Sequence, residues 1–349
     1  MTKLLIVDDS ALMRRKLSSL FEQAGGFDIR LARNGREAVE ENRVFQPDVM
    51  TLDINMPEMD GLTALSLVMA ERPTPVVMVS SLTVKSALAT FEALALGAVD
   101  YVAKPDGTIS LHLARIEAEL LAKVRHAAQA RLRPAPPVRA APVRERAPLR
   151  LAPAAVPSHE TGLVLIGVST GGPRALEDLL PQLPASFPWP VLIAQHMPAA
   201  FTSLFAQRLD RLCALQVQEV TEPMALAPGK IYVARGGGDV VVSKRRDQRV
   251  ALPQPEHAEH LWHPSVELLG RSALQHYPAQ ELIGVMLTGM GHDGAQAFAE
   301  IHRRGGRTIA ESAESAVVFG MPERLINQGA ADRVLPADRI AKQLVDWLS

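Results

Sequence analysis

Short apolar runs alternate with amphipathic stretches of helix length along most of this 349-residue chain. In the first third, the apolar runs are KLLIV, DIRLA, DVMTLD, PVVMVS and AVDYVA, and stretches such as NGREAVEENRVF separate them. Five β-α units in succession favour an α/β fold with a parallel, doubly wound sheet. Such sheets bind ligands at the carboxyl ends of their strands, so the polar residues there are the first candidates for a site.

A change in composition divides the chain into two parts. Residues 129–160 consist mainly of Pro, Ala and Arg and have no apolar period, which is typical of a linker. The stretch holds six arginines and two glutamates, so it either binds an acidic partner or only keeps the tether soluble. We therefore predict one domain over residues 1–125, a linker over 126–160 and a second domain over 161–349.

The second part resumes the alternation, with GLVLIG, PVLIAQ, ELIGVML and RTIAES as strands and a closing helix at ADRIAKQLVDWL. Between them, GKIYVARGGGDVVVS is typical of two strands joined through a glycine turn, an antiparallel hairpin. We expect a Rossmann-like, mostly parallel α/β domain with this hairpin attached.

Composition excludes several classes of protein. Hydrophobic residues make up 47% of the chain and the formal net charge is -1, so no global field attracts nucleic acid or an anionic membrane. The single cysteine, Cys213, excludes an internal disulfide framework and fits a reducing compartment. No apolar run is long enough to span a bilayer. We expect a cytoplasmic protein that neither binds nucleic acid nor inserts into a membrane.

Acidic residues follow two strands of the first domain. Asp8 and Asp9 come directly after the first strand, and Asp53 ends the third. In a 2-1-3-4-5 strand order these strands are neighbours, so the carboxylates converge, and hard oxygen ligands suit Mg²⁺. Ser80 ends the fourth strand and Lys104 follows the fifth. Each acid alone could be a solvated strand end or a helix cap, but together these groups are what a phosphoryl acceptor requires.

The motifs VDDS, LDINMPEMDG, VMVSS and DYVAKP resemble the receiver domain of bacterial response regulators over residues 1–125. The resemblance implies phosphorylation of one aspartate by a histidine kinase. It also implies a Mg²⁺ site and a set of switch residues. The implied residues are Asp53 as the phosphorylated residue, Asp8, Asp9, Asp53 and the backbone carbonyl of Asn55 as the metal site, and Ser80, Tyr101 and Lys104 as the switch.

In the second domain, the stretch LIGVSTGGP is either a phosphate-binding loop or a support for a nucleophile. A P-loop requires Lys-Ser/Thr where Pro173-Arg174 stands, and a dinucleotide fingerprint requires glycine where Ser169 stands. The pattern G-x-S-x-G is present from Gly167 to Gly171, between a predicted strand and a predicted helix. This favours Ser169 as a nucleophile.

A nucleophilic serine needs a base and an acid that orients the base. His196 ends the strand in VLIAQHMP, and Asp293 lies in LTGMGHDG after another strand, so both are expected at the edge that carries Ser169. His292 is the competing base, but neighbouring side chains in a loop usually diverge. The histidines of HAEHLWH (257–263) either bind a metal or form a polar loop or substrate rim, and the absence of a completing ligand favours the second reading.

The motifs IGVSTGGP, AQHMP, PGKIYVA, LTGMGHDG and ESAVVFGMP resemble the catalytic domain of the chemotaxis receptor methylesterases, the CheB family, over residues 160–348. Two segments depart from the family pattern. ARGGGD (234–239) stands where a Pro-Gly segment ending near a histidine is expected, and LWHPSVE (261–267) stands where Arg usually precedes Pro-Ser.

The resemblance implies a phosphorylation-activated hydrolase that removes γ-glutamyl methyl esters from chemoreceptors and deamidates receptor glutamines. Ser169, His196 and Asp293 would form the triad, and the backbone N-H groups of Thr170 and Met290 would form the oxyanion hole. We expect no cofactor in this domain, a monomeric protein, and an unmodified receiver that covers the Ser169 cleft.

Two alternatives belong to other classes. One is a response regulator whose second domain binds DNA, although that domain shows no basic helix-turn-helix pattern. The other is a non-catalytic signalling scaffold that retains a hydrolase fold. Trapping of Ser169 by a serine-directed reagent would separate an enzyme from such a scaffold.

Overall fold

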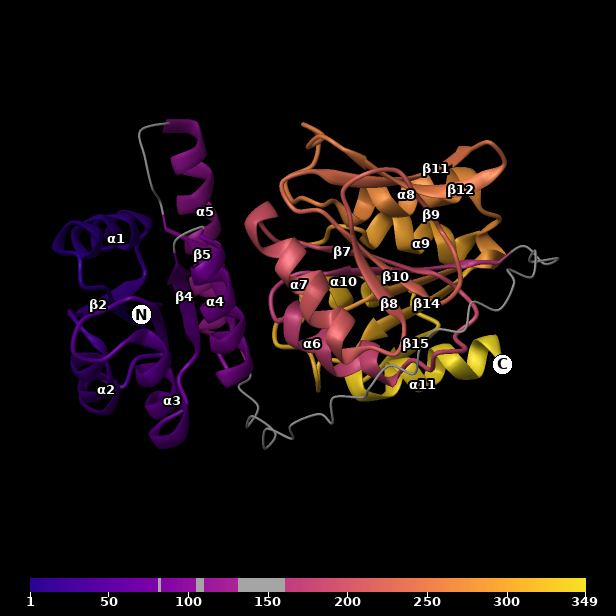
Figure 1. The fold of residues 1–349 in the computed structure, drawn as a ribbon. Coiled ribbons are helices and arrows are strands. Elements are labelled where there is room, and N and C mark those ends of the chain that lie inside the picture. Colours follow the sequence, from indigo (N-terminus) through magenta and orange to yellow (C-terminus); the bar gives the residue numbers. More distant parts are fainter. Residues whose placement is uncertain (81–82, 105–109, 131–160) are drawn as a thin grey trace. The chain divides into compact units, whose positions relative to one another are not determined.

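A computed structural model describes residues 1–80, 83–104, 110–130 and 161–349 of the chain (Figure 1). The chain divides into two compact units, Met1–Pro137 and Val138–Ser349. Residues 131–160, most of the predicted linker, lie outside the described residues. No helix in the described ranges is both long and apolar enough to cross a membrane.

The first unit is a parallel sheet with the strand order β2-β1-β3-β4-β5, which confirms the order expected from the sequence. Helices α1 and α5 contact each other, and α2, α3 and α4 contact one another in turn. The strands are β1 (Thr2–Val7), β2 (Phe27–Ala32), β3 (Val49–Asp53), β4 (Val76–Ser80) and β5 (Asp100–Ala103). The helices are α1 (Ala11–Ala24), α2 (Gly35–Val44), α3 (Gly61–Glu71), α4 (Val84–Leu96) and α5 (Ser110–Ala127).

Polar caps fix where the helices of this unit begin. The side chains of Ser10, Asn34, Asp60 and Thr83 each accept a hydrogen bond from a backbone N-H in the first turn of α1 to α4. Such caps satisfy donors that have no partner inside the helix. Each helix therefore starts a few residues beyond a strand, and the strand ends remain at one edge.

The second unit contains a seven-stranded parallel sheet with the order β15-β14-β13-β6-β7-β10-β8. Its strands are β6 (Leu163–Val168), β7 (Val191–Gln195), β8 (Gln216–Val220), β10 (Lys230–Ala234), β13 (Leu282–Met286), β14 (Arg307–Glu311) and β15 (Arg333–Leu335). Strands β6, β7 and β13 have no exposed residue, as expected for parallel strands covered on both faces.

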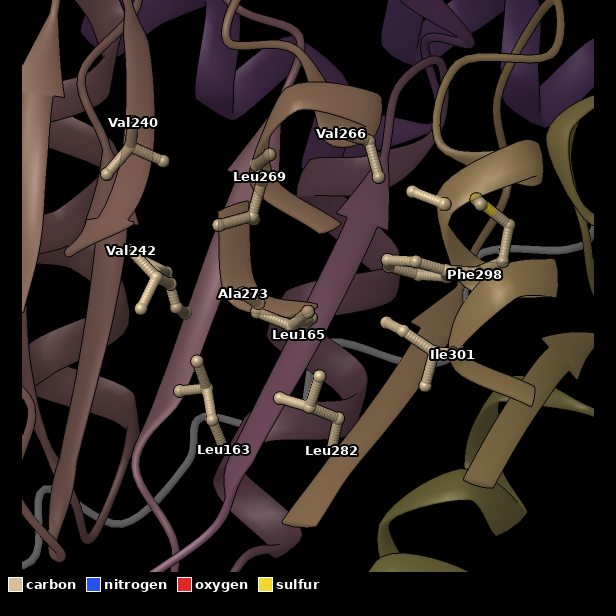
Figure 2. Packing of buried hydrophobic residues seen from close by; sticks show 14 of the residues in the cluster. Leu163, Leu165, Val240, Val242, Val266, Leu269, Ala273, Leu282, Phe298 and Ile301 are labelled. Atoms are coloured by element: carbon tan, nitrogen blue, oxygen red, sulfur yellow. The ribbon is translucent and has the colours of Figure 1, made fainter. Parts of the chain in front are cut away.

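Helices cover both faces of this sheet (Figure 1). One group comprises α6 (Gly172–Leu179), α7 (Ala199–Leu212) and α11 (Ala337–Leu348). The short 3-10 turn η1 (Leu180–Gln182) follows α6 and contacts all three helices. The other comprises α8 (Val266–His276), α9 (Ala295–Arg303) and α10 (Met321–Asn327), with the 3-10 turn η2 (Ala279–Glu281) before β13. Figure 2 shows Leu269 and Ala273 of α8 and Phe298 of α9 among the buried side chains that pack on β6 and β13.

A small antiparallel sheet, β11-β12-β9, packs against α8. It is formed by β9 (Met224–Ala225), β11 (Asp239–Arg245) and β12 (Gln248–Gln254). The antiparallel hairpin expected in this domain is present, but the pairing predicted within GKIYVARGGGDVVVS is wrong. Its first half is β10 of the parallel sheet, and its second half, β11, pairs with β12 instead.

The physical reason lies in the turn that joins β11 to β12. Arg246 and Asp247 both have positive φ, 45° and 66°, which two-residue hairpin turns of type I′ require. Neither residue is glycine, so the usual sequence signal is absent there, while the glycines at 236–238 gave a false one. A Cβ on Gly236 would lie 2.0 Å from the carbonyl oxygen of Met197, so that glycine serves a close approach between loops.

Candidate active site

Ser169 lies at the carboxyl end of β6, the strand between β13 and β7 in the sheet. Its backbone N-H donates to the carbonyl of Thr288 (3.0 Å), and its own carbonyl accepts from the backbone N-H of Gly172 (2.8 Å). Gly171 has a φ of 78° and caps α6, so the chain turns sharply from strand to helix after the serine. Ser169 is only 7% exposed at this edge of the sheet.

His196 lies beside Ser169, at the end of the neighbouring strand β7. Val168 pairs with Gln195 in the sheet, and the backbone N-H of His196 donates to the carbonyl of Val168 (3.1 Å). The imidazole Nε2 lies 2.9 Å from Oδ2 of Asp293. The other ring nitrogen, Nδ1, is buried and has no hydrogen-bond partner among the described residues. The structure thus brings the expected base and acid into contact.

Asp293 is held at the N-terminus of α8. Oδ2 accepts from the backbone N-H of Val266 (2.7 Å), and Oδ1 accepts from the backbone N-H of Glu267 (3.0 Å) and the hydroxyl of Ser265 (3.1 Å). Burial alone would raise the pKa of Asp293, but the hydrogen bond from His196 and these backbone donors lower it below its ordinary value. Asp293 is therefore an anion that can only accept, so Nε2 of His196 carries the proton between them.

Gln195 connects the two strand ends. It is 2% exposed, and its side-chain nitrogen donates to the carbonyl oxygens of both Ser169 (3.0 Å) and His196 (3.0 Å). A Cβ on Gly172 would lie 2.0 Å from its side-chain oxygen, so the amide fits against the first turn of α6. Apart from its place in AQHMP, no sequence signal distinguishes this residue.

The two candidates for the oxyanion hole flank the serine. Thr170 and Met290 are 2% and 7% exposed. A Cβ on Gly289 would lie 2.7 Å from the Cβ of Ser169, so the loop that carries Met290 lies directly against the nucleophile. Their roles remain a prediction, supported by this proximity.

Trp262 was not selected from the sequence, yet its ring is stacked against that of His196. Its ring is nearly parallel to the imidazole of His196, at 10° and with 6.1 Å between centroids. Its ring meets that of His292 edge to face, at 89° and 5.5 Å. His292, the alternative base, thus contacts this tryptophan, and the imidazole on Asp293 is that of His196.

The histidines of HAEHLWH are not gathered around a common point for a metal. The ring of His257 lies 5.4 Å from that of His260, while His263 Nδ1 lies 3.0 Å from both carboxylate oxygens of Asp239. Within the described ranges, the one acidic or histidine cluster with metal-ligand spacing is in the first unit.

That cluster lies where the sequence placed it. One oxygen each from Asp8, Asp9 and Asp53 lie within 4.8 Å of one another, a set of hard ligands that fits a divalent cation. The Lys104 ammonium lies 2.9 Å from Oδ2 of Asp8 and 2.8 Å from Oδ2 of Asp53. Asn55 is exposed beyond β3, next to this cluster in sequence.

Burial raises the pKa of Asp53 above its ordinary value, although Lys104 opposes the shift. Burial disfavours the charge of Lys104, but its hydrogen bonds to Asp53 and Asp8 raise its pKa. The other two predicted switch residues are both buried: Ser80 is 1% exposed at the end of β4, and Tyr101 is 3% exposed in β5. The backbone N-H of Lys104 donates to the carbonyl of Ser80 (2.7 Å), which joins the ends of β4 and β5.

Comparisons with known proteins agree with both halves of this description. A family model described as CheB methylesterase matches residues 164–344, and one described as response regulator receiver domain matches residues 4–114. A protein-glutamate methylesterase/protein-glutamine glutaminase of Rhodospirillum rubrum is 56% identical over 100% of this chain and 97% of its own. One of Rhodopseudomonas palustris is 51% identical over 99% of this chain and 98% of its own.

A solved structure is also similar to the second unit. The crystal structure of the Thermotoga maritima CheB methylesterase catalytic domain is 36% identical, with a TM-score of 0.52. The match covers 54% of this chain and 100% of that one.

Proposed function

This chain belongs to the CheB methylesterase family, and we propose that it hydrolyses γ-glutamyl methyl esters on chemoreceptors, releasing methanol, with Ser169, His196 and Asp293 as its triad. The observation that carries the proposal is the hydrogen bond between His196 Nε2 and Asp293, formed beside Ser169 at one edge of the sheet. The same chemistry on a side-chain amide would release ammonia and convert a receptor glutamine to glutamate.

In the first step, Oγ of Ser169 attacks the ester carbonyl carbon and its proton passes to His196. Because Nε2 is engaged by Asp293, Nδ1 is the nitrogen that takes this proton. The imidazolium that forms is stabilised by the anionic Asp293, which also fixes the tautomer. His196 then returns the proton to the departing methoxy group, which leaves as methanol.

In the second step, water attacks the acyl-enzyme. The water oxygen bonds to the acyl carbon while His196 takes one of the water protons. The bond between the acyl carbon and Oγ of Ser169 then breaks, and His196 returns the proton to Oγ. The negative oxygen in both steps would face the backbone N-H groups of Thr170 and Met290, which flank the serine. The product is a receptor glutamate and a regenerated serine.

The receiver supplies the regulation in this proposal. A histidine kinase would phosphorylate Asp53, so that a phosphoryl group carrying about -1.5 to -2 charges replaces the single negative charge of the carboxylate beside Lys104. Asp8, Asp9, Asp53 and the carbonyl of Asn55 would hold Mg²⁺, whose charge offsets that of the phosphoryl oxygens when it is bound. Ser80, Tyr101 and Lys104 would respond to the new charge, and the receiver would then release the Ser169 cleft.

Methanol release from methylated receptor membranes tests the activity. The parent protein should release methanol, and Ser169→Ala should release it more slowly by a factor on the order of 10³ or more. Ser203→Ala, on the exposed surface of α7, serves as the matched control and should behave as the parent does. Equal rates for the parent and Ser169→Ala would refute the nucleophile.

The same assay tests regulation when a small phosphodonor is added. The parent should be stimulated, and Asp53→Asn should keep its basal rate without stimulation, because it has no carboxylate to accept the phosphoryl group. Stimulation of Asp53→Asn to the level of the parent would refute the regulatory part while leaving the hydrolase intact. The domain limits 1–125, 126–160 and 161–349 and the monomeric, cytoplasmic state remain predictions of this proposal.

A further inference from the structure

The two segments that depart from the family pattern contact each other. Asp239 ends ARGGGD and begins β11, and His263 ends HAEHLWH. Nδ1 of His263 lies 3.0 Å from both oxygens of Asp239. The same carboxylate accepts from the backbone N-H groups of His257 (2.8 Å) and Ser265 (2.7 Å). Asp239 is thus the anchor of the loop that runs from 257 to 265.

This pair lies in the interior. The side chains of His263 and Asp239 are 4% and 0% exposed, and the nearest other carboxylate oxygen recorded for His263 is that of Glu256, 3.9 Å from Nε2. A buried carboxylate is costly unless donors surround it, and removing one partner of a buried pair leaves the other charge unsatisfied. The contact therefore fixes the loop far more firmly than an exposed ion pair would.

The residues on either side of His263 contact the catalytic base and acid. Before it, the ring of Trp262 lies nearly parallel to that of His196. After it, the hydroxyl of Ser265 donates to Oδ1 of Asp293 (3.1 Å), and Ser265 is fully buried. Ser265 is also the N-cap of α8, whose first N-H groups hold Asp293. One short segment thus connects Asp239 to both members of the dyad.

We propose that Asp239 and His263 form a positioning pair that holds the His196–Asp293 dyad in its working geometry through Trp262 and Ser265. Neither residue touches the reacting atoms. The inference rests on the proposed hydrolase, because it assigns the pair an effect on turnover. Catalysis of this kind depends on placement within fractions of an ångström, so loosening the segment lowers kcat more than it changes KM.

The chain offers a conservative and a disruptive variant at the same position. His263→Asn places an amide nitrogen the same number of bonds from Cα as Nδ1, so it keeps a donor to Asp239. His263→Leu removes the donor and keeps an apolar side chain of moderate size. We expect His263→Asn to retain kcat within about threefold and His263→Leu to lose it on the order of 10-fold or more, with KM changed by less than about twofold.

A second histidine-aspartate pair, whose side chains are 33% and 31% exposed, provides a control for the loss of such a contact elsewhere in the unit. His302 Nδ1 lies 3.2 Å from Oδ2 of Asp332, at the opposite end of α9 from Asp293 and beside the start of β14. His302→Leu should leave kcat within about twofold of the parent, whatever it does to the melting temperature. If His302→Leu and His263→Leu lose kcat equally, the effect is general destabilisation and the inference is wrong.

A double-mutant cycle completes the test. Asp239→Asn, His263→Leu and the double variant are compared by kcat. The two losses should combine to less than their product, because both variants weaken the same contact, although Asp239→Asn also disturbs the bonds from His257 and Ser265. Independent losses, or a His263→Leu protein that matches the parent in kcat, would overturn the inference. Ser169→Ala is measured in parallel: a failure of Ser169→Ala to lose activity refutes the proposed function instead.

Discussion

Two buried aspartates, one in each unit, show how the surroundings of a residue set its chemistry. Asp53 and Asp293 are 2% and 6% exposed; Asp53 ends β3 of one parallel sheet, and Asp293 lies in the loop after β13 of the other. Burial raises the pKa of Asp53, which has Asp8 nearby as a like charge. Burial would also raise the pKa of Asp293, but the hydrogen bonds from His196 and from the backbone N-H groups at the N-terminus of α8 outweigh it and lower the pKa.

The comparison teaches that a shared position in a sheet does not give a shared role. Asp53 lies in a cluster of carboxylates balanced by one ammonium, which suits a group that gains a phosphoryl group and a cation. Asp293 is fully supplied with donors and remains an anion that orients an imidazole. In the proposed function, the charge at Asp53 changes on phosphorylation, whereas the charge of Asp293 stays the same.

Replacement of His196, the proposed base, should have the largest effect on methanol release, and it changes the second unit only. His196→Ala should lower methanol release on the order of 10³-fold, because no other group takes the proton of Ser169. His292→Ala is the matched control and should stay within about fivefold of the parent, since His292 contacts Trp262 rather than Asp293. The opposite ranking of the two variants would make His292 the base.

Removal of divalent cations should abolish the regulation that depends on the first unit. With EDTA present, the several-fold stimulation by a small phosphodonor should disappear, while basal methanol release stays within about twofold. Among the described residues, Asp8, Asp9 and Asp53 form the one group of acidic or histidine side chains with metal-ligand spacing. A basal rate that falls with EDTA and returns with Mg²⁺ would contradict the separation of the two sites.

The smallest effect concerns pH and tests the permanent charge of Asp293. A carboxylate whose pKa is lowered by folding contributes stability above its unfolded value near 3.8, and this contribution is lost only as the pH falls through the lower folded value. The difference in melting temperature between the parent and Asp293→Asn should therefore not shrink from pH 8 to about pH 5. A difference that shrinks between pH 7 and pH 5 would show that Asp293 takes up a proton there.

The sequence predicted most of the fold because its signals were local. Each buried parallel strand is a short apolar run, and the strand order of the first sheet followed from one known topology. Ser169 and His196 could be selected because each stands directly after such a run, and Asp293 because it lies in the loop that follows another. The hairpin was misplaced because the true turn, at Arg246 and Asp247, uses residues that rarely adopt positive φ.

The supporting residues could not be predicted, because their roles depend on contacts distant in the sequence. Gln195 donates to the carbonyl of Ser169, 26 residues away, and Ser265 donates to Asp293, 28 residues away. Asp239 and His263 are joined only once β11 and the loop after β12 are placed on α8. Nothing in their immediate sequence distinguishes them from polar loop residues.

The central claim is that Ser169 is a nucleophile activated by His196, and covalent labelling tests it most directly. A fluorophosphonate reagent is incubated with the full-length protein, and the modified residue is mapped by mass spectrometry. The account predicts a label on Ser169 in the parent and in His292→Ala, and almost none in His196→Ala. A label on another residue, or equal labelling of Ser169 in His196→Ala, would contradict it.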